Sequence, residues 1–111
     1  MSAPGFGVRP PNYAKGIEIK NSSSTEVSVT VTFQGSDTVI HKTATIGAGT
    51  AKKFDEQVQS MGSYSVVIPV HKFTVSQGGQ QQLEHQPAVT EGVVDTVYKE
   101  IVVDSSGLSV V

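Results

Sequence analysis

The stretch EVSVTVTF, residues 26–33, alternates between apolar and polar side chains without a fault. Val27, Val29, Val31 and Phe33 fall on one face, and hydroxyl side chains fall on the other. A period of two is typical of a β-strand that buries one face, and five of the eight residues are β-branched, which favours strands. This strand needs a second layer of structure to cover its apolar face.

The composition extends this reading to the whole chain. With 111 residues, the chain is long enough to form one domain with a core of its own. It contains 18 Val and 6 Ile against 2 Leu, which is the usage of strands rather than helices. We therefore expect an all-β fold, specifically an antiparallel Greek-key β-sandwich of immunoglobulin-like architecture with about seven strands.

The seven expected strands follow from the apolar runs and the turn sequences between them. They comprise residues 16–20, 26–33, 38–46, 50–58, 64–75, 93–104 and 108–111. Two stretches, 50–61 and 93–103, also match helical spacing, so both readings stay open for them. Within 38–46, Lys42 shares the apolar face, which a bulge or an edge position would explain.

The strand at 64–75 changes the parity of its apolar residues part of the way along. Val66, Ile68 and Val70 share one face, whereas Phe73 and Val75 have the opposite parity. A bulge restores the alternation, and Pro69 is the natural place because its nitrogen cannot donate to a sheet ladder.

Gly62 precedes Tyr64 by two residues at the start of this Val-rich run. The pattern resembles the tyrosine corner of immunoglobulin-like sandwiches, in which the tyrosine hydroxyl bonds to the backbone upstream. The resemblance covers about six residues and lacks the Cys pair and Trp of true immunoglobulin domains. It implies a sandwich whose core includes Tyr64. The residues expected in that core are Ile19, Val27, Val29, Val31, Phe33, Ile40, Ile46, Tyr64, Val66, Ile68, Val97 and Ile101.

Charge and Cys usage limit the partners and the compartment. Eight basic and ten acidic residues leave a net charge of −2 without a run of like charge, so we expect no nucleic-acid or membrane partner. The absence of Cys excludes a disulfide scaffold and fits a reducing compartment. Without an apolar segment of membrane-spanning length or a charged leader, we expect a cytoplasmic location.

Residues 1–13 are rich in Pro and Gly and have no periodicity, which predicts a flexible arm before a domain at 14–111. Pro10, Pro11 and Tyr13 fit the Pro-Pro-any-Tyr pattern that WW-type domains recognise, so a WW-type partner is one expectation. The alternative is that Tyr13 packs down as the first residue of the domain.

Residues 76–92 lack a clear period, and a loop of that length in a small domain is usually functional. Gln80, Gln82, Glu84 and His85 are its candidate partner-binding residues. Alternatively, part of the segment forms a helical turn or extends a strand, with Leu83 packed inward.

Catalytic patterns are absent from the sequence: it has no HExxH, no Gly-x-Ser-x-Gly and no phosphate-binding loop followed by Lys. We therefore expect a protein-interaction or structural module, not an enzyme, with no cofactor, that uses strand edges and the 76–92 segment. A metal protein or small enzyme around His41, His71 and Glu84 is the main alternative. Carbohydrate binding is a further one, although a chain without Trp and with three Tyr supplies few stacking platforms.

Overall fold

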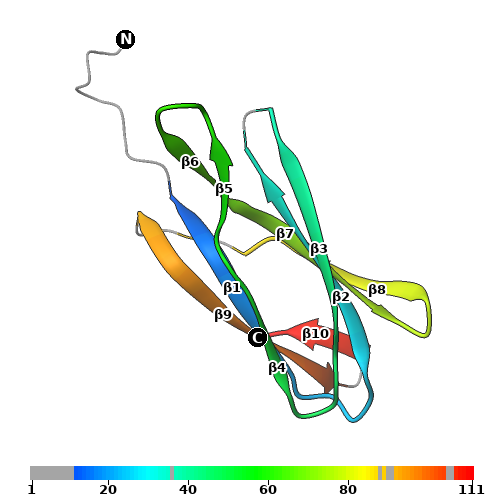
Figure 1. Cartoon of the computed structure of the whole chain (residues 1–111). Helices are drawn as coiled ribbons and strands as arrows, with labels where there is room; N and C mark the ends of the chain where they lie inside the picture. The colour runs from blue at the N-terminus through cyan, green and yellow to red at the C-terminus, as the bar shows by residue number, and fades with distance from the viewer. Residues whose placement is uncertain (1–11, 36, 88, 90–91, 105–106) are drawn as a thin grey trace.

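The computed structural model describes residues 12–35, 37–87, 89, 92–104 and 107–111, and the regular structure in these residues is all β-strand (Figure 1). The strands form two four-stranded sheets and one two-stranded ribbon. The first sheet has the order β10-β9-β1-β4, the second sheet has the order β3-β2-β7-β8, and the ribbon is β5-β6. The bounds are β1 Tyr13–Asn21, β2 Val27–Gln34, β3 Val39–Ile46, β4 Ala51–Phe54, β5 Gln57–Ser60, β6 Ser65–Ile68, β7 Val70–Gln77, β8 Gln80–His85, β9 Val93–Asp104 and β10 Gly107–Val110. No helix that could span a membrane occurs in the described residues.

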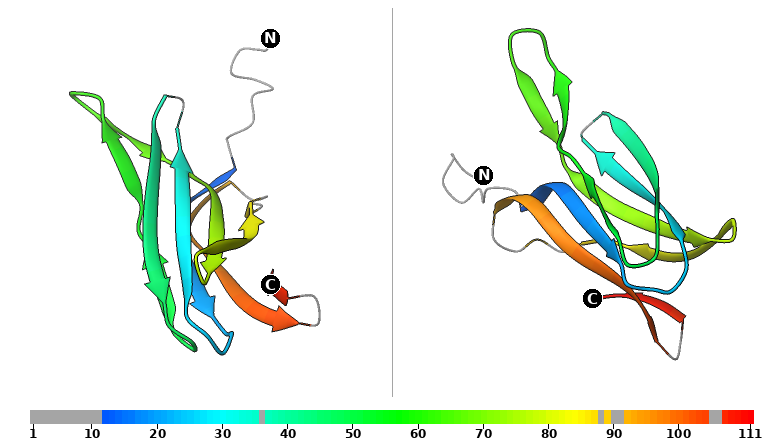
Figure 2. Two further views of the ribbon diagram at one scale, coloured as in Figure 1. Left: turned by 90° about the vertical axis from the view of Figure 1, so that its right-hand side faces the viewer. Right: turned by 60° about the horizontal axis from the view of Figure 1, so that its bottom comes forward.

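The two sheets share one apolar core, and Figure 2 shows them as separate layers. The apolar face of β2 is at most 1% exposed, as the alternation at 26–33 predicted. The first sheet covers it with Ile17, Ile19, Phe54 and Ile101. Each such buried side chain contributes about 1.5–3 kcal/mol, so the contact between the layers dominates the stability of the fold.

The hairpin predicted after Phe33 is confirmed. β2 and β3 pair antiparallel over eight consecutive residue pairs, and the Gly35 amide donates to the Thr38 carbonyl oxygen at 2.8 Å across the turn. The register has no bulge, so one explanation offered for Lys42 is wrong. Lys42 lies opposite buried Val31 and yet is exposed, because β3 is an edge strand from which the side chain reaches solvent.

The parity change near Pro69 is also confirmed. Thr32 pairs with Lys72 and Phe33 pairs with Val70, so His71 is the extra residue of a bulge. Pro69 separates β6 from β7, and its carbonyl oxygen accepts the last bond from β2, donated by the Gln34 amide at 2.9 Å. On the C-terminal side of Pro69, β7 therefore pairs with β2, whereas β6 on its N-terminal side belongs to the ribbon.

The structure has ten described strands where the sequence predicted about seven. The runs at 50–58 and 64–75 each divide into two strands, and the 76–92 segment contains β8. The expectation of a loop throughout that segment is wrong, and the alternative, a strand extension with Leu83 packed inward, is confirmed. Gly78 and Gly79 have φ angles of 65° and 85°, which suit a tight hairpin turn, so β8 folds back onto β7 and places Leu83 against the core.

Three further expectations are settled by the pairing. Residues 51–54, 57–60 and 93–104 are strands, so the helical readings are wrong. The C-terminal hairpin forms as predicted, with β10 antiparallel to β9. The sheets are not wholly antiparallel, however, because β1 and β9 pair in parallel from Tyr13 to Asn21.

Two residues assigned to the core are at the surface. Tyr64 is 60% exposed and Val66 is 39% exposed, because both belong to the ribbon, which precedes Pro69 and is not part of the second sheet. Tyr64 lies in the ribbon turn, where its carbonyl oxygen accepts from the Met61 amide at 2.7 Å. The tyrosine-corner reading is therefore wrong in placing this ring in the core. The other predicted core residues are buried or, for Ile40 and Val97, packed against the core.

Candidate functional site

The outer face of the first sheet carries the most exposed large apolar side chain of the described residues, Tyr98, at 70%. The parallel pairing of β1 with β9 places Glu18 beside Tyr98 and Lys20 beside Glu100. Paired residues on neighbouring strands lie on the same face, so four side chains of alternating chemistry form a compact group. At Tyr98, β9 is paired with β1 on one side, whereas the ladder with β10 covers only Ile101 to Asp104, so the Tyr98 ring stands beside one neighbouring strand.

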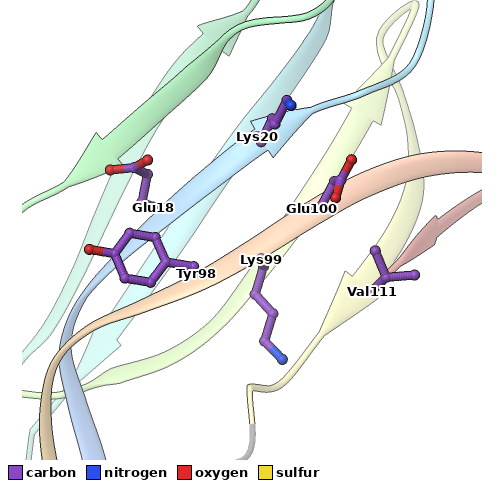
Figure 3. Close-up of a pocket in the computed structure, with 6 residues that line it drawn as sticks. All are labelled: Glu18, Lys20, Tyr98, Lys99, Glu100 and Val111. Carbon is purple, nitrogen blue, oxygen red and sulfur yellow. The ribbon is translucent and has the colours of Figure 1, made fainter.

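A groove of about 330 Å³ follows this group along β1 and β9 (Figure 3). We call it the Tyr98 groove. Val111 closes one end and is held there by two backbone bonds to Glu100, of 3.2 and 3.0 Å. The residues lining the groove are Glu18, Lys20, Tyr98, Lys99, Glu100 and Val111.

The charged groups of the Tyr98 groove are only partly engaged. The Ser22 hydroxyl donates to the Glu100 carboxylate, which fixes one side chain at the edge. No salt bridge among the described residues includes Glu18, Lys20 or Lys99. The groove therefore offers an aromatic face, with cations and a carboxylate free to pair with groups on a ligand.

Lys99 lines the groove, although its position in β9 belongs to the side that faces the core. It pairs in register with Ile19, which faces the core, and its charge acts on His85 of β8. Burial first, and the Lys99 ammonium second, lower the pKa of His85 below its usual value. The His85 ring lies 5.4 Å from the Phe73 ring at 50°, and its Nε2 atom is buried without a hydrogen-bond partner among the described residues.

The residues predicted from the 76–92 segment do not form one site. Gln80 is exposed at the β7–β8 turn, and Gln82 lies in β8, although its side chain is outside the described part. Glu84 points to solvent and accepts from Lys72 Nζ at 2.9 Å, whereas His85 faces Phe73 and the core. Glu84 and His85 diverge because adjacent residues of a strand project to opposite faces.

The predicted WW-type ligand is described only at its end. Pro10 and Pro11 lie outside the described residues. Tyr13 is half-buried as the first residue of β1, and its amide donates to the Gly92 carbonyl oxygen at 3.2 Å. A domain boundary at 13/14 would divide this strand, since β1 begins at Tyr13 and not at Gly16 as predicted.

The alternative metal site does not assemble in the described part of the chain. No group of three or more His, Asp or Glu side chains there could hold a metal ion. The His41 ring nitrogen Nδ1 lies 3.1 Å from the Thr32 hydroxyl on the edge of the second sheet, and His71 occupies the bulge. Glu84 is engaged by Lys72.

The sequence interpretation did not select Tyr98 as a site residue. The sequence did contain a signal for Tyr98. Val97 and Ile101 alternate onto the face of β9 that points to the core, and Tyr98 and Glu100 alternate onto the opposite face. An aromatic residue on the polar face of a strand is the pattern that would have identified it. Its neighbours Glu18 and Lys20 depend on the pairing of β1 with β9, which alternation does not reveal.

Comparison with known proteins found no relative: no family model, curated protein or solved structure matches the chain significantly.

Proposed function

We propose that this chain is a non-catalytic protein-interaction module that binds its partner through the Tyr98 groove. The observation that carries the proposal is the 70% exposure of Tyr98 on the outer face of the first sheet, among incompletely paired charges. Tyr is enriched at binding hot spots because its ring buries a large area and its hydroxyl still bonds. The charged side chains of the groove provide the polar rim of such an interface.

The expected partner is a protein surface that supplies an apolar contact for Tyr98 and charged groups for Lys20 and Glu18. The sequence predicted that strand edges also bind the partner. The edges β3 and β4 are weaker candidates for this, because the exposed charges of Lys42 and Lys52 oppose the addition of another strand. A chain without Cys suits the reducing cytoplasm as the place of this interaction.

The test compares proteins captured from the native cell by the wild type, by Tyr98→Ala and by Tyr64→Ala. Tyr64 is a matched control, because it is 60% exposed but belongs to the ribbon. We expect Tyr98→Ala to weaken binding of the partner by about 2 kcal/mol, roughly thirtyfold, and Tyr64→Ala to retain it. Equal capture by the wild type and Tyr98→Ala contradicts the proposal.

Carbohydrate binding is the second candidate, and the same residue favours it. A sugar ring stacks on an exposed aromatic face, and Glu18, Lys20 and Glu100 place hydrogen-bonding groups around Tyr98. A glycan array separates the two functions. Binding that Tyr98→Phe keeps and Tyr98→Ala loses favours a sugar, and an array without binding leaves the protein partner as the better proposal.

For the fold, we propose the Greek-key, immunoglobulin-like arrangement. It is supported by the way the chain alternates between layers: β1 lies in the first sheet, the β2–β3 hairpin in the second, and β4 beside β1 again. The WW-type ligand at Pro10, Pro11 and Tyr13 stays a prediction. Its Tyr would have to leave the β1 ladder to bind, so a peptide of residues 5–15 is expected to bind better than the folded chain.

A further inference from the structure

The β5-β6 ribbon projects from the rest of the fold. Its strands pair only with each other, from Gln57 opposite Ile68 to Ser60 opposite Ser65. Figures 1 and 2 show the ribbon at the same end of the molecule as the turn between β2 and β3. A two-stranded ribbon alone is marginally stable in water. One face of this ribbon rests on the fold, because Gln59 accepts from the Thr38 hydroxyl at 2.7 Å and Ile68 is buried in the core, whereas its opposite face has no such contact with the described residues.

The ribbon is unusual in its side chains. Residues 57–68 contain no charged residue, although the rest of the sequence carries charges on most of its strands. Four of its large apolar side chains are exposed, by 39–60%. They are Val58, Met61, Tyr64 and Val66. Exposed, uncharged strands with high β propensity are the kind that pair with another chain.

The edges of the two large sheets differ from the ribbon. Lys42 of β3 lies opposite core residue Val31, and Lys52 of β4 lies opposite core residue Ile19, yet both lysines are exposed. A charge on the core-facing side of an edge strand opposes the addition of another strand. β8 carries Glu84 at its edge, and β10 lies against β8. The ribbon has no such protection.

We propose that the ribbon is a self-association surface, through which two copies of this chain pair about a two-fold axis. β5 is the available edge, because the β6 side lies next to the end of β2, where Gln34 bonds the Pro69 carbonyl oxygen. A second copy is the partner that fits the composition. Because residues 57–68 carry no charge, two identical β5 strands meet without like-charge repulsion in any register, and this pairing makes a four-stranded sheet from two marginal ribbons.

The first test is sedimentation velocity on the whole chain from about 5 to 500 μM. We expect the wild type to form a dimer, and Val58→Lys to weaken the dimer at least about tenfold, because the two-fold axis brings the new charges together. Val103→Lys is the control: Val103 is 58% exposed, against 53% for Val58, but lies near the end of β9. It should dimerise as the wild type does.

A second measurement leaves the apolar side chains of the ribbon unchanged. The chain has no Cys, so Ser60→Cys accepts a single spin label. Antiparallel pairing of two β5 strands predicts a distance between labels below about 20 Å. A wild type that stays monomeric throughout, a dimer that Val58→Lys leaves intact, or labels farther apart than this would overturn the proposal.

Discussion

The side chain of Asn21, the last residue of β1, donates from Nδ2 to the Ile46 carbonyl oxygen at 2.9 Å, across 25 residues of sequence. The same nitrogen donates to the Thr25 carbonyl oxygen at 2.8 Å, and Oδ1 accepts from the Ser23 amide and hydroxyl. Asn21 is fully buried. It therefore ties the loop that leaves β1 to the end of β3 and satisfies polar groups that would otherwise be buried without partners.

We expect Asn21→Ala to lower the free energy of unfolding by about 3 kcal/mol, because it leaves several buried polar atoms unpaired. Asn21→Asp should be at least as unstable, since it loses both donated bonds and places a carboxylate near two carbonyl oxygens. Urea denaturation measures the change. Ser24→Ala, on an exposed residue of the same loop, is the control and should stay within about 0.5 kcal/mol of the wild type.

The same burial bears on Asn21-Ser22-Ser23, which matches the glycosylation acceptor pattern. A glycan on Nδ2 would replace one of its two hydrogens, break at least one of the bonds to Ile46 and Thr25, and have no room at this buried position. We expect this site to stay unmodified when the folded protein is exposed to the glycosylation machinery, as intact mass measurement would show. A glycosylated protein with unchanged stability would contradict the role given to Asn21.

The central strand shows what alternation predicts well. We expect Val29→Asp to unfold the domain, because Val29 is fully buried and a carboxylate there costs several kcal/mol, a large part of the stability of a small domain. Circular dichroism detects the loss of the strand signal. Val103→Asp, on a largely exposed residue, should keep the wild-type spectrum; if both variants fold equally well, the assignment of the core is wrong.

Alternation tells which side chains share a face, but not whether that face is covered. It placed Val29 and Val66 in the core by the same argument, and only Val29 is buried. The two residues differ in which strands surround them. Val29 lies in β2, which pairs with β7 inside the second sheet, whereas Val66 lies in β6, which pairs only with β5. Which strands pair over long distances, as β1 does with β9, depends on the whole fold and has no local signal.

The turn at Gly78 and Gly79 is a different kind of miss. Two adjacent glycines are a recognised hairpin signal, and they outweigh the weak alternation of residues 80–85. The sequence therefore contained the information for β8, but the lack of periodicity in QQQLEH left a loop and a strand extension equally open. About half of residues 76–92, the segment expected to bind a partner, therefore lies in β-strands.

Gly16 is required where β1 passes close to the end of β4. A Cβ atom at this position would lie 2.8 Å from the Phe54 carbonyl oxygen, which is shorter than any normal contact with a backbone atom. We expect Gly16→Ala to destabilise the fold by about 1–3 kcal/mol, measured by thermal or urea unfolding. Gly35→Ala is the control, because its nearest contact would be 3.7 Å from an Ile68 methyl group. Equal stability of the two variants would contradict this account.

The pH dependence of stability is expected to contain a contribution from His85. In the unfolded chain this imidazole titrates at about 6.5, whereas burial and then the Lys99 charge hold its pKa lower in the folded protein. Well above pH 6.5 the side chain is neutral in both states. As the pH falls from about 6.5 through the lowered folded pKa, the unfolded state takes up the proton first, so the free energy of unfolding decreases.

Urea denaturation at pH 7.5 and 5.5 measures this loss, and His85→Gln should make it smaller. Lys99→Gln removes the second cause, so NMR titration of the imidazole should show the His85 pKa moving up toward its ordinary value while remaining below it, because burial persists. A His85 pKa that does not respond to Lys99→Gln would show that the charge on β9 does not act on β8, and an equal pH dependence in His85→Gln and the wild type would assign the acid sensitivity to other groups.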